Sequence, residues 1–148
     1  MGLETKIIYV DGVRFQVVAR DHEITSDQPL ENSGTDAGMT PPELLLASLG
    51  SCAAYYAVEY LRARSIPAAG LTVTVSAQKA QKPARVTDFR ISLSVPGVDH
   101  QRHRDGLLRA AKSCLIHNTL THVSTIQIEL ENKNAEVDQY RPELVAKH

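Results

Sequence analysis

Residues 40–64 constrain the fold more than any other part of the sequence. The segment opens with Thr40 as a helix N-cap, Pro41 at the first helical position and Glu43 at the capping-box spacing, which predicts a helix to about Arg64. Its apolar side chains occupy all faces instead of one stripe. Such a helix must be buried all round, by a sheet, by other helices or by a second subunit. These side chains are Leu44, Leu45, Leu46, Ala47, Leu49, Ala53, Ala54, Tyr55, Tyr56, Ala57 and Val58.

The helix carries a cysteine, Cys52, near its middle. A buried cysteine is ordinarily a small hydrophobe, and it becomes a nucleophile when its thiolate is stabilised. The second cysteine, Cys114, lies on the apolar face of another predicted helix, within residues 105–118. If the two thiols meet, one can attack a substrate and the other can resolve the oxidised product as a disulfide. The alternative is that both cysteines only pack in the core.

Alternating apolar and polar residues predict strands on both sides of the long helix. An Asp11-Gly12 pair between two β-rich runs predicts a hairpin with a two-residue turn, and residues 28–39 predict an exposed loop. The result is an α+β domain with mainly antiparallel pairing. The expected strands lie within residues 6–19 (two strands), 22–27, 71–78, 88–95 and 124–131.

Length and charge narrow the class of protein. The 148 residues fit a single domain, 1–148, with a core over about 5–131 and a polar tail over 132–148. Sixteen basic residues balance seventeen acidic ones, so we expect neither a nucleic-acid partner nor a membrane-binding surface. The apolar run 44–58 is short for a membrane span, and no leader is recognisable, which predicts a cytoplasmic protein. Permanent structural disulfides are unusual in that compartment.

Candidate groups for activating a thiolate are found near the start of the chain. An arginine lowers the pKa of a nearby thiol, and a carboxylate can orient that arginine. Arg14 and Arg20 are expected on one face of a strand, although two such arginines also suit a solvated face. Glu43 belongs to the capping box and lies about 13 Å from Cys52 along one straight helix. It could therefore act only through an arginine that reaches across, or across a subunit boundary.

Two further combinations are weaker. Cys114, His117 and His122 could form part of a zinc site, but zinc sites use three or four ligands at firmer spacing. Cys52 with His117 and Asn118 matches the residue types of a Cys-His-Asn hydrolase, which is a generic pattern. The sequence has no dinucleotide-binding fingerprint, P-loop or serine elbow, so we predict no bound metal or cofactor.

The segments TPPELLLASLGSC and AAKSCLIHNTL, with the order of strands around them, resemble the OsmC/Ohr family of thiol-dependent peroxidases, in particular its OsmC-like branch. The resemblance covers about residues 5–131. It implies an intertwined homodimer in which the partner buries the central helices and the active sites lie near the subunit interface. This would account for a helix that is apolar on all faces.

The same resemblance implies a reaction and the residues that perform it. Cys52 would attack the O–O bond of an organic hydroperoxide, Cys114 would form a disulfide with it, and an external dithiol such as a dihydrolipoyl group would reduce both. The activating arginine would be Arg14 or, as second choice, Arg20. The family's glutamate position is occupied by Pro42, with Glu43 one residue later, and Leu115 follows the second cysteine where the family generally has proline.

The expected role is therefore defence against oxidative stress by hydroperoxide reduction. The alternative is a non-enzymatic, dimeric, stress-associated protein that binds a small hydrophobic ligand or senses redox state. Reactivity of Cys52 separates the two, because a peroxidase needs a stabilised thiolate and a packing cysteine resists alkylation in the folded state.

Overall fold

The computed structural model describes residues 2–122 and 125–131. The chain forms an α+β fold with antiparallel sheets and one long helix, as predicted. It divides into two compact units, one containing the chain up to Leu44 together with the chain from Ile128, and the other containing Leu45–Gln127. The polar tail predicted from residue 132 lies outside the described residues, and the prediction of a single domain stays a prediction.

The first unit is built on a three-stranded antiparallel sheet of β1 (Lys6–Asp11), β2 (Arg14–Ala19) and β3 (His22–Ser26), in that order. The predicted hairpin is confirmed, but its two turn residues are Gly12 and Val13, one position later than predicted. Asp11 stays in the ladder because it pairs with Arg14 and forms an ion pair with it at 2.6 Å. Gly12 takes the left-handed φ of 49° that the turn requires.

The two faces of this sheet differ in character. Directly paired residues of antiparallel strands share a face, which places Ile7, Tyr9, Phe15, Val17 and Ile24 together on one side. Four of them are between 36% and 62% exposed, so this apolar face is open in the single chain. Gln16, on the other face, is buried and accepts a hydrogen bond from Thr25. The four exposed side chains are Ile7, Tyr9, Phe15 and Ile24.

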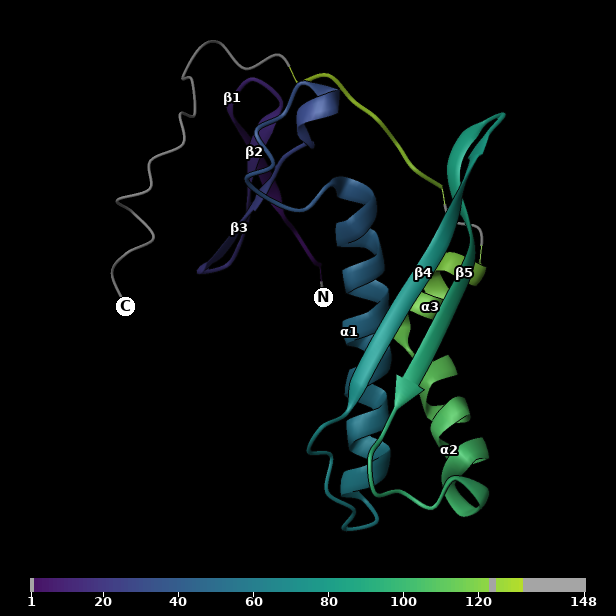
Figure 1. The fold of residues 1–148 in the computed structure, drawn as a ribbon. Helices are drawn as coiled ribbons and strands as arrows, with labels where there is room; N and C mark the ends of the chain where they lie inside the picture. The colour runs from purple at the N-terminus through teal and green to yellow at the C-terminus, as the bar shows by residue number, and fades with distance from the viewer. Residues whose placement is uncertain (1, 123–124, 132–148) are drawn as a thin grey trace. The chain divides into compact units, whose positions relative to one another are not determined.

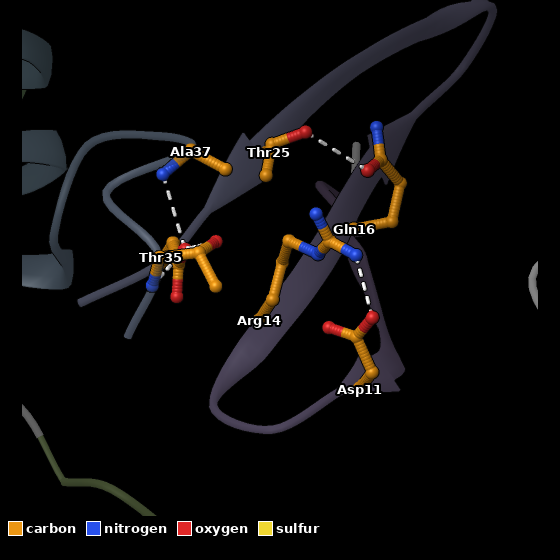
Figure 2. Close-up of polar contacts among 7 residues, drawn as sticks. Asp11, Arg14, Gln16, Thr25, Thr35 and Ala37 are labelled. Atoms are coloured by element: carbon orange, nitrogen blue, oxygen red, sulfur yellow. Dashed lines mark hydrogen bonds and ion pairs between the residues drawn. The ribbon is translucent and has the colours of Figure 1, made fainter. Parts of the chain in front are cut away.

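The loop after β3 is closed around one buried carboxylate, Asp27. Its Oδ2 accepts hydrogen bonds from the backbone N and the hydroxyl of Thr35 (3.0 and 2.7 Å) and from the backbone N of Ala37 (3.1 Å), and its Oδ1 accepts one from Gln28 N (2.8 Å). Figure 2 shows Thr35 and Ala37 in this loop, with the hydrogen bond of the Ala37 nitrogen drawn as a dashed line. The predicted exposed loop is thus confirmed, with a short 3-10 turn, η1 (Leu30–Asn32), and a fixed conformation that its composition did not reveal.

The long helix α1 (Pro41–Arg62) starts as predicted. The Glu43 carboxylate accepts hydrogen bonds from the backbone N and the hydroxyl of Thr40, at 2.7 and 2.8 Å, which is the Glu43 half of the predicted capping box. By length and composition α1 could span a membrane, a test that the core helix of a water-soluble protein also passes. Figure 1 shows α1 as the longest helix of the chain.

In the second unit α1 packs against the antiparallel hairpin of β4 (Thr72–Gln81) and β5 (Ala84–Ser94). Figure 1 shows this hairpin passing in front of the helices. Gly50 lies close to β4, since a Cβ atom there would lie 2.9 Å from Val75 Cγ2. One stripe of α1 at four-residue spacing is buried: Leu49, Ala53, Ala57 and Leu61.

Within the single chain α1 is buried on one stripe only, so its predicted burial on all faces requires a second subunit. Tyr55 remains 60% exposed, and only 28% of the most apolar window of the helix is buried. The physical reason is that few elements pack on α1, since one hairpin and two shorter helices cover only part of the surface of a 22-residue helix. Coverage by a second subunit stays a prediction.

Two helices follow the hairpin, α2 (His100–Lys112) and α3 (Leu115–Thr121). The prediction of one continuous helix through Cys114 is therefore wrong, because the helix is interrupted at Ser113 and Cys114. The prediction of a final strand is also wrong: residues 125–131 have no regular structure, and Ile126, Ile128 and Leu130 are 86–99% exposed. A strand needs a neighbouring edge, and within the described residues no strand pairs with this segment.

Candidate functional site

The two cysteines of the chain meet inside the second unit. Cys114 is completely buried and its thiol is hydrogen-bonded with that of Cys52, which is half-buried on α1. Burial, reinforced by this hydrogen bond, raises the pKa of the Cys114 thiol. Both are free thiols in this structure. Sequence spacing alone could not establish this contact, which is the geometric condition for disulfide exchange.

The interruption between α2 and α3 determines the position of Cys114. Cys114 is the N-cap of α3, in an extended conformation, and its Sγ accepts a hydrogen bond from His117 N at 3.4 Å. Leu115 is the first residue of α3, the position at which helices accept proline readily. The start of α3 thus forms with leucine where the family generally has proline.

An apolar pocket of about 510 Å³ lies within the second unit, and its lining includes Leu49, three residues before Cys52, and His117, three residues after Cys114. It lies between α1, β5 and α3. Pockets of this size suit small organic molecules. No charged residue lines it, and His117 contributes a buried Nδ1 that has no hydrogen-bond partner among the described residues. The lining residues are Leu45, Leu49, Val86, Phe89, Ile91, His117, Leu120 and Thr121.

The predicted arginines lie in the first unit. Arg14 begins β2 on the face of Gln16, and its Nη2 is bonded to Asp11, as Figure 2 shows. Its buried Nε has no hydrogen-bond partner among the described residues. Arg20 follows the end of β2, exposed in a turn with φ of 55°. The expectation that both arginines share one strand face is therefore wrong, because the strand ends at Ala19.

Glu43, also in the first unit, holds the N-cap residue Thr40. The structure thus brings together Cys52 and Cys114, whereas the catalytic roles of Arg14, Arg20 and Glu43 stay predictions. Sequence analysis missed the pocket residues of β5 and the structural role of Asp27. The only available signal for the pocket was the apolar alternation of β5, which predicts burial without showing an empty space.

The weaker combinations receive no support from the geometry. Across residues 2–122 and 125–131, no three side chains of the types His, Cys, Asp and Glu are grouped so that they could hold a metal ion. His122 instead caps α3, donating from Nδ1 to the backbone oxygen of Asn118 at 2.8 Å. A Cys-His-Asn hydrolase site stays an untested possibility of residue types alone.

Comparison with known proteins identifies the family. The model of the family described as OsmC-like protein matches residues 34–130, about two thirds of the chain. A search of curated proteins gives no match.

Solved structures share the fold. A protein of Psychrobacter arcticus named for osmotic stress induction and detoxification response has 24% identity and a TM-score of 0.73, covering 80% of this chain and 89% of its own. An OsmC-like protein of Mycoplasma pneumoniae has 19% identity and a TM-score of 0.72, covering 83% and 89%. An organic hydroperoxide resistance protein OsmC of Legionella pneumophila has 15% identity and a TM-score of 0.59, covering 81% and 89%. The chain therefore belongs to the OsmC-like family.

Proposed function

We propose that this protein is a thiol-dependent peroxidase that reduces organic hydroperoxides in defence against oxidative stress. The observation that carries the proposal is the contact between Cys52 and the buried Cys114 beside an uncharged apolar pocket. Membership of the OsmC-like family supports it, since that family includes organic hydroperoxide resistance proteins.

The chemistry proceeds in three balanced steps. The Cys52 thiolate attacks the terminal oxygen of the hydroperoxide, so that the S–O bond forms and the O–O bond breaks, and the departing alkoxide takes a proton from water to give an alcohol. Cys114 then displaces hydroxide from the Cys52 sulfenic acid, and a disulfide and water result. An external dithiol reduces the disulfide by thiol exchange and is itself oxidised to a disulfide.

Each remaining predicted residue has a role in this proposal. Arg14 is the first choice for stabilising the Cys52 thiolate and the departing alkoxide, because its Nε is buried and lacks a partner among the described residues. Arg20, exposed in a turn, is the second choice. Glu43 is proposed to orient the arginine, in addition to its contact with Thr40.

The proposal includes a homodimer in the cytoplasm. The open apolar face of the β1–β3 sheet, the incompletely covered α1 and the exposed apolar side chains of residues 125–131 support a second copy as the partner. The substrate is a small organic hydroperoxide and the reductant a dithiol such as a dihydrolipoyl group. A non-enzymatic ligand-binding protein is the second candidate, favoured specifically by the preformed pocket.

The deciding experiment is consumption of cumene hydroperoxide and of hydrogen peroxide by the purified protein with dihydrolipoamide. We expect faster turnover of the organic peroxide, loss of turnover in Cys52→Ser, and loss of disulfide formation in Cys114→Ser. Ser51→Ala, which changes the exposed neighbour of Cys52, is the matched control and should retain activity.

Arg14→Gln should slow the reaction by about a hundredfold or more, and Arg20→Gln should have little effect. Absence of turnover in protein with fully reduced thiols would leave the ligand-binding candidate.

A further inference from the structure

Another cavity, of about 460 Å³, lies in the second unit where α1 ends and α2 begins. It shares no lining residue with the apolar pocket, and among the described residues no carboxylate and neither cysteine lines it. Two arginines contribute to its wall, so its charge is positive. We propose that this cavity binds the phosphate group of a small phosphate monoester through the guanidinium groups of Arg64 and Arg102. The lining residues are Tyr60, Arg64, Ile66, Arg102 and His103.

Arg64 is positioned by the last turn of α1 without losing its charge. Its guanidinium carbon lies 3.7 Å from the centroid of the Tyr60 ring, and its Nη1 donates a hydrogen bond to the Tyr60 backbone oxygen at 3.0 Å. An aromatic ring and a carbonyl oxygen carry no net charge, so the positive charge is not neutralised. A guanidinium has five N–H donors, and the described residues use one of them. The others are available for an oxyanion.

Arg102, in the first turn of α2, supplies the second charge. Its side chain makes no ion pair within residues 2–122 and 125–131. The nearby carboxylate of Asp99, the N-cap of α2, accepts hydrogen bonds from the backbone N of Gln101 and of Arg102, at 3.0 and 3.3 Å. These two N–H groups are thus satisfied by the protein itself. The proposed recognition therefore depends on the side chains and not on the N-terminus of the helix.

A hydrogen bond between α1 and α2 fixes one wall of the cavity. It joins the Tyr60 hydroxyl and His103 Nδ1 at 3.1 Å, and the two rings pack edge to face. Tyr60 approaches α2 this closely because residue 106 is glycine, where a Cβ atom would collide with the Tyr60 hydroxyl. Figure 1 shows the end of α1 and the start of α2 at the same end of the second unit. The elements that carry the two arginines are thus held together before a ligand binds, which lowers the entropic cost of binding.

Charge and size specify the class of ligand. A phosphate monoester carries close to two negative charges above pH 7, which matches two guanidinium groups that are not neutralised. The planar fork of a guanidinium also fits two oxygens of one phosphate. A sulfate monoester has a similar shape and one negative charge, so it would be held more weakly. A cavity of about 460 Å³ has room for a small organic group beyond the phosphate, with Ile66 as its apolar contact.

The test titrates the reduced full-length protein at pH 8 with two probes, phenyl phosphate and phenyl sulfate, by isothermal titration calorimetry. We expect phenyl phosphate to bind about tenfold more tightly than phenyl sulfate. Arg64→Gln and Arg102→Gln should each raise the Kd for phenyl phosphate about tenfold, the effect of losing one charge-assisted hydrogen bond. Absence of phenyl phosphate binding to the wild type, or equal affinities for the two probes, would overturn the proposal.

Two neighbouring arginines provide matched controls. Arg62 forms an ion pair with Glu59 at 2.6 Å and Arg104 with Asp105 at 3.4 Å, and neither arginine lines the cavity. Arg62→Gln and Arg104→Gln remove the same charge two residues away from the cavity arginines and should leave the Kd unchanged. If they raise the Kd as much as the two cavity variants do, the probe responds to the net charge of the region and the proposal is wrong.

A second readout uses the wild type alone. In ¹⁵N-labelled protein, saturation with phenyl phosphate should shift the Nε–H resonances of Arg64 and Arg102 and leave those of Arg62 and Arg104 in place. Resonances of Arg64 and Arg102 that ignore bound phenyl phosphate would contradict the assignment. The inference goes beyond the proposed function, because neither cysteine lines this cavity and the test involves no redox step. Its failure would leave the proposed peroxidase function unaffected.

Discussion

Cys114 is held as a protonated thiol by its surroundings. It is completely buried, and burial disfavours the thiolate because the charge would lose its hydration. The hydrogen bond with Cys52 acts in the same direction. A protonated thiol is a poor nucleophile, so in the proposed reaction Cys114 would not compete with Cys52 for the hydroperoxide. In the proposed cycle, this environment fixes the order in which the two sulfurs react.

The raised pKa of Cys114 predicts how stability depends on pH. Since the folded-state pKa lies above the unfolded value near 9.0, the contribution to stability is complete below pH 9 and is lost as pH rises through the folded-state pKa. The free energy of unfolding of wild type should therefore fall more steeply above pH 9 than that of Cys114→Ala. Urea unfolding under reducing conditions from pH 7 to 10.5 measures this difference, and parallel curves for the two proteins would contradict it.

At the scale of elements, the loop that follows β3 is held in place by hydrogen bonds to the Asp27 carboxylate instead of by helix or strand hydrogen bonds. Four hydrogen bonds from Gln28, Thr35 and Ala37 converge on one carboxylate and hold both arms of the loop. These bonds lower the pKa of Asp27 far below its ordinary value, the one from the Thr35 hydroxyl most strongly. The loop also needs Gly34, because a Cβ atom there would collide with the backbone oxygen of Gln28.

Asp27→Asn should lower the urea midpoint of the protein and expose the loop to proteolysis, because an amide cannot accept all four hydrogen bonds as a carboxylate does. A depressed pKa contributes stability above the ordinary value near 3.8 that is lost as pH falls through the folded-state value. The difference between wild type and Asp27→Asn should thus be constant above pH 5 and shrink below pH 4. Asp36→Asn, in the same loop, is the matched control, and an equal effect of both variants would refute a special role for Asp27.

Elements were predictable from sequence where the signal is local. The capping box at Thr40 and Glu43 was readable because it depends on residues three positions apart. The break before α3 was not, since helix-forming residues and apolar spacing continue through Cys114. Asp27 was missed because its donors are backbone N–H groups, which every residue except proline carries and which only the folded loop brings together.

At the scale of the whole molecule, apolar surface remains uncovered in a single chain. The exposed face of the β1–β3 sheet and the side chains of Ile126, Ile128 and Leu130 are the main contributions. Large exposed apolar side chains of this kind are typical of interfaces. The sequence pattern predicted a final strand over these last residues. Alternation of apolar and polar residues predicts which side chains are buried. It does not predict which chain contributes the strand that pairs with this segment.

The proposed homodimer makes this surface testable. Ile128→Lys should raise the dimer dissociation constant by about tenfold or more, since burial of one isoleucine contributes about 1.5–3 kcal/mol. Gln127→Lys introduces the same charge on the adjacent residue, which points the other way in an extended segment, and should have a smaller effect. Analytical ultracentrifugation across protein concentrations measures both. A 16.2 kDa monomer at every concentration would refute the dimer, and equal effects would refute the role of this segment.

The contact between Gly50 and Val75 has a consequence for changing the shape of the pocket. Since only the Val75 side chain separates the α1 backbone from β4 there, this contact sets the spacing of helix and hairpin. It lies beside the pocket lining, because Leu49 precedes Gly50 and Ile91 pairs with Val75. The pocket can then be enlarged or narrowed by substitutions on β5 and α3, such as Val86, Phe89 and Leu120, while the framework that carries Cys52 stays in register. Such substitutions would reshape the pocket without replacing either cysteine.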